Sequence, residues 1–137
     1  EVHARLRADS ARTFLRDRAD RPARYVAGAL PALPFPDDSF DLVLSSHLLF
    51  TYADRLDPEA HRAALREMAR VSRGQVRVFP LVDQAGHGRQ ELLTALLADD
   101  ELQATVRTVD FEFQHGARSM LQLDAGPARD VALRSAP

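Results

Sequence analysis

The sequence contains no cysteine, which excludes disulfides, thiolate metal sites and a cysteine nucleophile. No apolar run approaches the roughly 20 residues that a membrane-spanning helix needs, and no signal peptide opens the chain. The five histidines form no H-x-x-x-H or H-E-x-x-H pair, so no metal site is predicted. The G-x-S-x-G turn of many hydrolases is also missing. These absences favour a cytoplasmic protein that neither enters a membrane nor holds a metal.

A strong charge of one sign is lacking as well. The chain has 18 basic and 20 acidic residues and a formal net charge of −2, so it lacks the net positive charge that is typical of nucleic-acid-binding domains. Hydrophobic residues make up 45% and charged residues 28%, as in ordinary globular proteins. A chain of 137 residues forms one domain at most, with a modest core.

Three helices are predicted. The first covers residues 3–18 and ends before Pro22, because the residue before a proline is disfavoured in the α region. The second begins at Asp57-Pro58, where Asp57 can cap the free amides and Pro58 suits the first helical position, and Gly74 is the expected left-handed terminator. The third covers residues 89–98.

Strands are predicted between these helices. Residues 25–27, 41–45 and 75–79 are the predicted strands. The apolar residues within 41–45 are consecutive, which is typical of a parallel strand covered on both faces. Residues 104–113 alternate, with Val106, Val109 or Phe111, and Phe113 inward, and residues 119–123 follow, so an antiparallel pair is expected. The fold class is therefore α/β.

Two of these strands end in small residues, and these ends are the candidate ligand site. The run that includes Val26 stops at Gly28, and the run that includes Val43 stops at Ser45-Ser46. We expect the two strands to be adjacent and parallel, because open α/β sheets bind ligands outside the carboxyl ends of their strands.

Residues 24–52 resemble the class I S-adenosylmethionine-dependent methyltransferases. That family has a strand, Gly-Asp-Ala, Leu-Pro-Phe, a short acidic turn, and then Phe-Asp with three apolar residues and Ser. The matching segments follow in the same order: Gly28, Leu33-Pro34-Phe35, Asp37-Asp38-Ser39, Phe40-Asp41, Leu42-Val43-Leu44 and Ser45-Ser46-His47.

A narrower resemblance, to an uncharacterised bacterial branch of the type 11 methyltransferases, extends over about residues 20–124. Its matching segments are Arg24-Tyr25-Val26, His47, Leu49-Phe50, Tyr52, Leu56-Asp57, His61, Arg77-Val78-Phe79-Pro80-Leu81 and Phe111-Glu112-Phe113-Gln114-His115-Gly116. The resemblance implies a Rossmann-like methyltransferase sheet whose parallel strands end in an antiparallel hairpin. It also implies S-adenosylmethionine as the cofactor.

Each candidate site residue has a functional interpretation and a structural one. By resemblance, Gly28, Ala29 and Leu30 face the adenine, although a tight turn explains them equally well. Ser45 and Ser46 lie beside the methionine part of the cofactor, or are small for packing.

The remaining candidates concern the acceptor and the proton. His47 could take a proton near neutral pH, or cap the next helix. Phe50 and Tyr52 could wall a substrate pocket, although aromatic residues after a buried strand are more often core. His61, in the first turn of the second helix, is expected to be structural.

Two family features are missing. No G-x-G-x-x-G occurs, and Ala29 stands where the family has an acid. The chain also begins at Glu1. We interpret residues 1–124 as the carboxyl-terminal part of a methyltransferase domain that lacks its first two strands, and residues 125–137 as a poorly ordered tail.

The expected function is methyl transfer from S-adenosylmethionine to an unknown acceptor, impaired by the absent glycine loop. The alternative is a non-catalytic interaction domain that forms a homodimer through an exposed sheet edge. A third, weaker interpretation is a dehydrogenase remnant that binds nicotinamide nucleotides.

Overall fold

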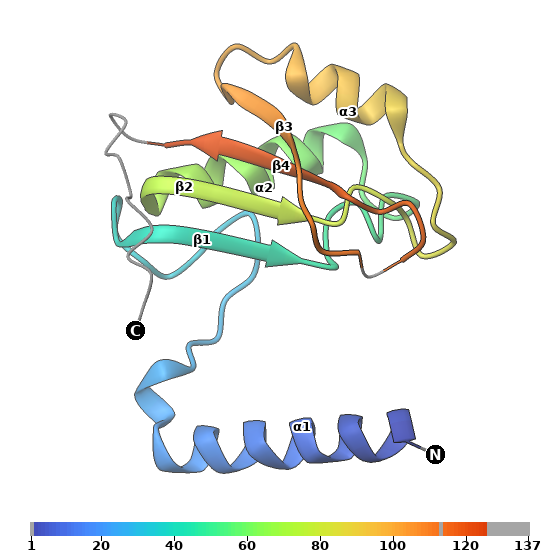
Figure 1. Ribbon diagram of the computed structural model, residues 1–137. Helices are drawn as coiled ribbons and strands as arrows, with labels where there is room; N and C mark the ends of the chain where they lie inside the picture. Colours follow the sequence, from blue (N-terminus) through green and yellow to red (C-terminus); the bar gives the residue numbers. More distant parts are fainter. Residues whose placement is uncertain (1, 113, 126–137) are drawn as a thin grey trace.

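The chain forms a four-stranded mixed sheet with two helices on one face and one helix set apart (Figure 1). A computed structural model describes residues 2–112 and 114–125. The strand order is β1-β2-β4-β3. The elements are α1 (Val2–Asp20), the short 3-10 helix η1 (Pro22–Arg24), β1 (Phe40–Ser46), α2 (Pro58–Arg70), β2 (Ser72–Phe79), α3 (Gln90–Leu97), β3 (Ala104–Thr108) and β4 (Ser119–Asp124). Within the described residues, no helix is long and apolar enough to cross a membrane.

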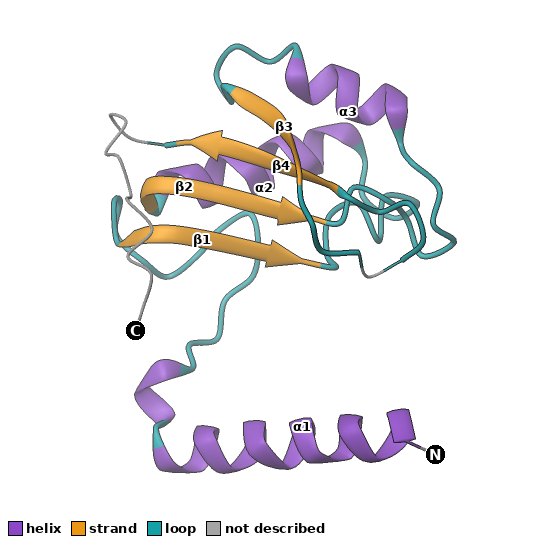
Figure 2. Cartoon of the chain, in the orientation of Figure 1, coloured by secondary structure: helices purple, strands orange, loops and turns teal. Residues whose placement is uncertain are grey.

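The sheet combines a parallel pair with an antiparallel hairpin, as the sequence predicted. β1 and β2 are parallel, with Val43 opposite Val76. β4 pairs antiparallel with both β2 and β3. Parallel strands need a crossover connection, and α2 provides it between β1 and β2. The carboxyl ends of β1 and β2 therefore lie at the same edge of the sheet (Figure 2).

The core lies between the sheet and the α2–α3 layer. Leu65 of α2, Leu96 of α3 and Val76 of β2 are fully buried in one cluster. α2 begins as predicted: the Asp57 carboxylate accepts a hydrogen bond from the Ala60 amide at 2.7 Å, and Pro58 occupies the first turn.

Gly74 does not terminate α2, contrary to the prediction. The helix ends at Arg70, and Gly74 lies inside β2. A Cβ atom built on Gly74 would overlap the carbonyl oxygen of Asp41 on β1. The β1–β2 register is irregular at this point, between Phe40 and Leu42. Glycine is needed here for the close approach of two backbones.

The predicted strand at residues 25–27 is absent, so the prediction that Val26 and Val43 lie on adjacent strands is wrong. The segment is extended coil, and Val26 is 56% exposed. Tyr25 turns back onto α1, where its hydroxyl donates to Asp17 at 2.7 Å and its ring meets Phe14 edge-on at 5.4 Å. Three consecutive apolar residues predict a buried strand here, but the Tyr25 side chain contacts α1 and the Val26 side chain is exposed to solvent.

The strand predicted at residues 104–113 is shorter than expected. β3 ends at Thr108, and Val106 and Phe111 are 41% and 62% exposed, so neither faces the core. β3 is an edge strand, and only Ala104 of its side chains packs against the core cluster. Phe113 and residues 126–137 lie outside the described residues.

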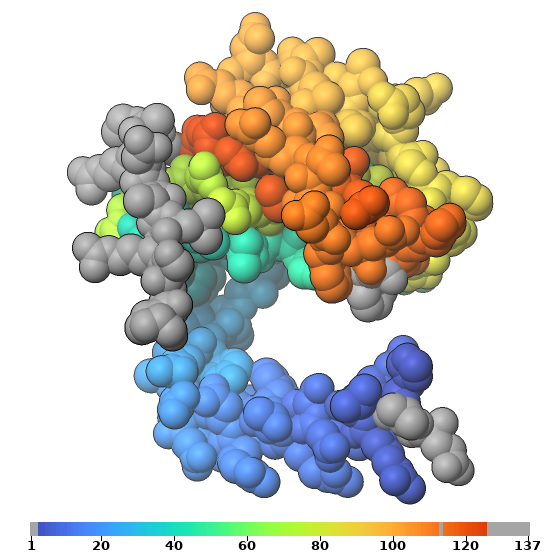
Figure 3. Space-filling model, viewed as in Figure 1, coloured from blue at the N-terminus to red at the C-terminus, as the bar shows by residue number. Residues whose placement is uncertain are grey.

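Among the described residues, no helix covers the second face of the sheet. Leu42 and Leu44 of β1 point to this face and are 43% and 67% exposed. α1 does not cover them, because it lies away from the sheet, joined to it by a single segment (Figure 3). β1 also forms an edge of the sheet, since β2 is its only neighbour among the described strands.

Candidate functional site

The carboxyl ends of β1 and β2 meet side by side. Ser46 is opposite Phe79 in the parallel register, and the His47 amide donates to the Phe79 carbonyl at 2.9 Å. This contact fixes the first residue beyond β1 against the last residue of β2. It brings the predicted Ser45, Ser46 and His47 together at the edge where ligands bind in open α/β sheets.

The polar groups at the tip of β1 are held in a tight turn. His47 has a left-handed backbone with φ of 55°, and its Nδ1 atom lies 2.8 Å from the Ser46 hydroxyl oxygen. Ser46 is exposed, whereas the Nε2 atom of His47 is buried. The Ser45 hydroxyl is also buried and has no hydrogen-bond partner among the described residues. A buried hydroxyl without a partner marks a position where a ligand could supply one.

An aromatic wall beside this turn was not predicted as part of the site. The ring of Phe79 lies between His47, whose ring centroid is 6.3 Å away, and Phe111, at 5.9 Å. Phe111 follows the end of β3 and is largely exposed. The alternation of residues 104–113 predicts an inward strand position for Phe111, so no pattern indicates its place beside Phe79.

The predicted adenine-facing residues form a separate tight turn. Ala29 and Ala32 form an isolated bridge, and the Ala32 amide donates to the Ala29 carbonyl at 2.9 Å. Gly28 and Ala29 are exposed, and Leu30 packs against the core. Within residues 2–112 and 114–125, no hydrogen bond joins this turn to the Ser45–His47 turn.

A clamp on α2 fixes the Pro-rich loop that follows this turn. The Glu67 carboxylate accepts from the Leu33 amide at 2.6 Å and from the Arg70 guanidinium at 2.7 Å and 2.8 Å. Arg70 also donates to the Phe35 carbonyl and to Asp37. The hydrogen bonds from Arg70, and then the one from Leu33, lower the pKa of Glu67 from 4.5 to about 2.

Two predicted aromatic residues have different environments. Phe50 is 1% exposed and packs edge-on against His61 at 5.8 Å, so it belongs to the core and its prediction as a pocket wall is wrong. Tyr52 is half-buried, with the Arg55 guanidinium 5.6 Å from its ring centre. Aromatic residues after a buried strand continue the core when the chain folds back under it, as Phe50 does.

His61 is structural, as expected. It is fully buried, with Nδ1 2.8 Å from the Asp57 carbonyl oxygen and Nε2 3.1 Å from the Leu49 carbonyl oxygen. These two contacts tie the start of α2 to the loop that follows β1.

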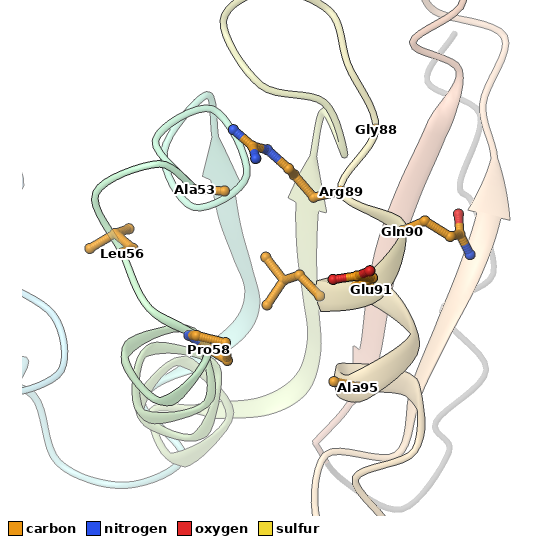
Figure 4. A pocket seen from close by; sticks show the side chains of 9 residues that line it. Ala53, Leu56, Pro58, Gly88, Arg89, Gln90, Glu91 and Ala95 are labelled. Carbon is orange, nitrogen blue, oxygen red and sulfur yellow. The ribbon is translucent and has the colours of Figure 1, made fainter.

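A cavity of about 470 Å³ opens between the loop after β1 and the start of α3. Figure 4 looks into it: Ala53 and Leu56 come from the loop, Pro58 from the start of α2, and Arg89, Glu91 and Ala95 from the other wall. Arg89 and Glu91 belong to no recognisable sequence motif, so this cavity was not predicted.

A family model described as "Methyltransferase domain" matches residues 4–79. The chain is similar to the uncharacterized protein MJ0045 of Methanocaldococcus jannaschii, with 29% identity over 110 residues, which are 80% of this chain and 48% of that protein. It is also similar to the uncharacterized methyltransferase YcgJ of Bacillus subtilis, with 36% identity over 73 residues, which are 53% of this chain and 26% of that protein.

The chain thus spans about half the length of the first relative and about a quarter of the second. No solved structure gave a significant match.

Proposed function

The chain belongs to the methyltransferase domain family, and from that premise we propose that it takes part in methyl transfer from S-adenosylmethionine to an acceptor molecule. Members of this family generally use S-adenosylmethionine. The cofactor supplies a methyl group on a positively charged sulfur. The protein's task is then to hold that group in line with the acceptor and exclude water, because positioning provides most of the acceleration.

The observation that carries the proposal is the buried, unpartnered Ser45 hydroxyl at the carboxyl end of β1. It fits a polar group of the cofactor, which would satisfy a hydroxyl that none of the described residues satisfies. Ser46 lies next to it and is exposed. We assign both serines to the methionine part of the cofactor.

His47 and Ser46 form a path for the acceptor's proton. The Nδ1 atom of His47 lies 2.8 Å from the Ser46 hydroxyl, which is exposed and can meet an acceptor. The hydroxyl would take the proton from the acceptor and pass its own to Nδ1. This role suits an imidazole, which gains and loses protons near neutral pH.

We expect the adenine side to bind weakly. Ala29 offers no carboxylate, although the Leu30 amide could still donate a hydrogen bond. Each missing hydrogen bond costs about 1 kcal/mol, or roughly fivefold in affinity. Affinity for the cofactor, and with it the activity of this chain, is therefore reduced.

Calorimetric titration with S-adenosylhomocysteine tests the proposal. We expect measurable binding, and we expect Ser45→Ala to weaken it about fivefold through the loss of one hydrogen bond. Ser39→Ala is the matched control, because Ser39 lies at the other end of β1 and donates to the Pro36 carbonyl. The absence of heat at millimolar ligand would refute cofactor binding by this chain.

The open edge of β1 favours a second candidate, a non-catalytic interaction domain. Beyond Asp41 and the irregular register beside it, the seven residues of β1 include no charged residue and no proline, which edge strands of soluble proteins usually carry against pairing. Leu42 and Leu44 add exposed apolar surface beside this edge. We propose that a second copy pairs there, and a monomeric mass by light scattering at every concentration tested would refute it.

A further inference from the structure

The cavity between the loop after β1 and α3 has an apolar body and one cationic side chain, Arg89, in its wall. Its apolar lining consists of Ala53, Leu56, Pro58, Leu92 and Ala95. Its volume of about 470 Å³ falls within the range of small-molecule sites, about 300–1,000 Å³. Both walls directly follow strands, since one is the loop after β1 and the other follows β2. The cavity therefore opens near the strand ends where the proposed methyl transfer occurs.

A short, well-ordered loop fixes Arg89 at this cavity. Asp83 accepts from the amides of Ala85 and His87, both at 2.9 Å, and Val82 bridges Gly88. The hydrogen bond from the His87 amide lowers the pKa of Asp83 most, and the positive charge of Arg89 lowers it further. Asp83 then binds Nη2 of Arg89 at 3.1 Å. The guanidinium is thus positioned before any ligand arrives, which reduces the entropy cost of binding.

Arg89 retains donors for a ligand. Its Nε atom is buried and has no hydrogen-bond partner among the described residues. Asp83 occupies only the Nη2 side. Arg89 precedes α3 without a side-chain cap, so the free amides of the first turn add positive potential at the same wall.

Glu91 limits the charge that this site accepts. It lies in the first turn of α3 and lines the same cavity as Arg89 (Figure 4). Glu91 would repel a doubly charged phosphate more strongly than it would repel a ligand with a single carboxylate.

We propose that the cavity binds a small molecule with an apolar body and one carboxylate, which pairs with Arg89. This ligand would be the methyl acceptor, and to that extent the inference rests on the proposed function. The body lies against Leu56, Leu92 and Ala95, and the carboxylate accepts from Nη1 of Arg89, because Nη2 binds Asp83 and Nε is buried.

The test is a nuclear magnetic resonance titration of the full chain with phenylacetate and, separately, with phenylacetamide, which has the same ring and no charge. We expect phenylacetate to bind at least tenfold more tightly, which is about 1.4 kcal/mol, and to shift the amides of residues 53–57 and 88–95. Arg89→Gln should abolish this preference. Arg73→Gln should retain it, because Arg73 pairs with Asp41 at the amino-terminal end of the sheet.

Equal affinity for the two compounds, an unchanged preference in Arg89→Gln, or no shift of these amides up to the solubility limit would overturn the inference. The titration with S-adenosylhomocysteine separates this result from the proposed function. If the chain bound phenylacetate selectively but did not bind S-adenosylhomocysteine, the carboxylate site would be supported and only the proposed methyl transfer would be refuted.

Discussion

Replacing Glu67 with Gln should destabilise the fold in a pH-dependent way. The substitution keeps the size of the side chain but removes the charge that accepts bonds from Leu33 and Arg70. The pKa of Glu67 falls from 4.5 to about 2 on folding, and this difference corresponds to about 3 kcal/mol of folding free energy. The Glu67 side chain is only 12% exposed, so solvent screens this interaction little.

The sign of the effect follows from the lowered pKa. A group with a depressed folded-state pKa stabilises the fold fully above its ordinary pKa of 4.5, and this contribution is lost as the pH falls toward about 2. At about pH 3 roughly 2 kcal/mol of the contribution is gone. Glu67→Gln should therefore lower the free energy of unfolding by about 2–3 kcal/mol near pH 6 and by about 1 kcal/mol near pH 3.

Urea denaturation followed by circular dichroism, at several pH values between these limits, measures the difference. Glu101→Gln is the matched control: this carboxylate is 74% exposed and makes one ion pair with Arg66, so we expect a loss below about 1 kcal/mol. If Glu67→Gln lowered the free energy of unfolding by the same amount at both ends of the pH range, the lowered pKa assigned to Glu67 would be refuted.

Three further predictions concern packing and association. Gly74→Ala should destabilise the β1–β2 pair by about 2 kcal/mol or more in urea denaturation, because its Cβ would overlap the Asp41 carbonyl, and a loss below about 0.5 kcal/mol would contradict that contact. Leu65→Ala should cost about 2–5 kcal/mol, because Leu65 is fully buried at the centre of α2; a small loss would mean that the core is loosely packed. Leu44→Lys should lower the self-association constant at least tenfold in sedimentation velocity while leaving the melting temperature nearly unchanged, and equal association of the two forms would argue against pairing at β1.

Local signals in the sequence predicted the parallel pair and its crossover helix well. Asp57-Pro58 specifies a helix start by capping and by backbone geometry, and both effects act within a few residues. The consecutive apolar residues of β1 identified a strand, although its outer face turned out to be exposed. The antiparallel pairing of β3 with β4 was also correct.

The errors came where position depends on distant parts of the chain. Tyr25-Val26 has the composition of a strand, but a strand forms only beside another strand, and here Tyr25 bonds to Asp17 instead. Gly74 could have ended a helix or allowed a close backbone contact, and only the approach of Asp41 decides between them.

The residues of the candidate site divide in the same way, into those with a local sequence signal and those placed by distant parts of the chain. Ser45, Ser46 and His47 were found because they follow a recognisable strand. Arg89 reaches the cavity, and Phe111 reaches the ring of Phe79, only through loops whose paths no local pattern specifies.

The isolation of α1 has a consequence for how the protein melts. Its apolar side chains Leu6, Phe14 and Leu15 remain 48–60% exposed, and its support comes mainly from short-range pairs such as Asp9 with Arg12. A helix of 19 residues with so little burial is only marginally stable in water. Heating should therefore unwind α1 before the sheet loses its cooperativity, so that helical and aromatic dichroism follow separate curves and a two-state description fails.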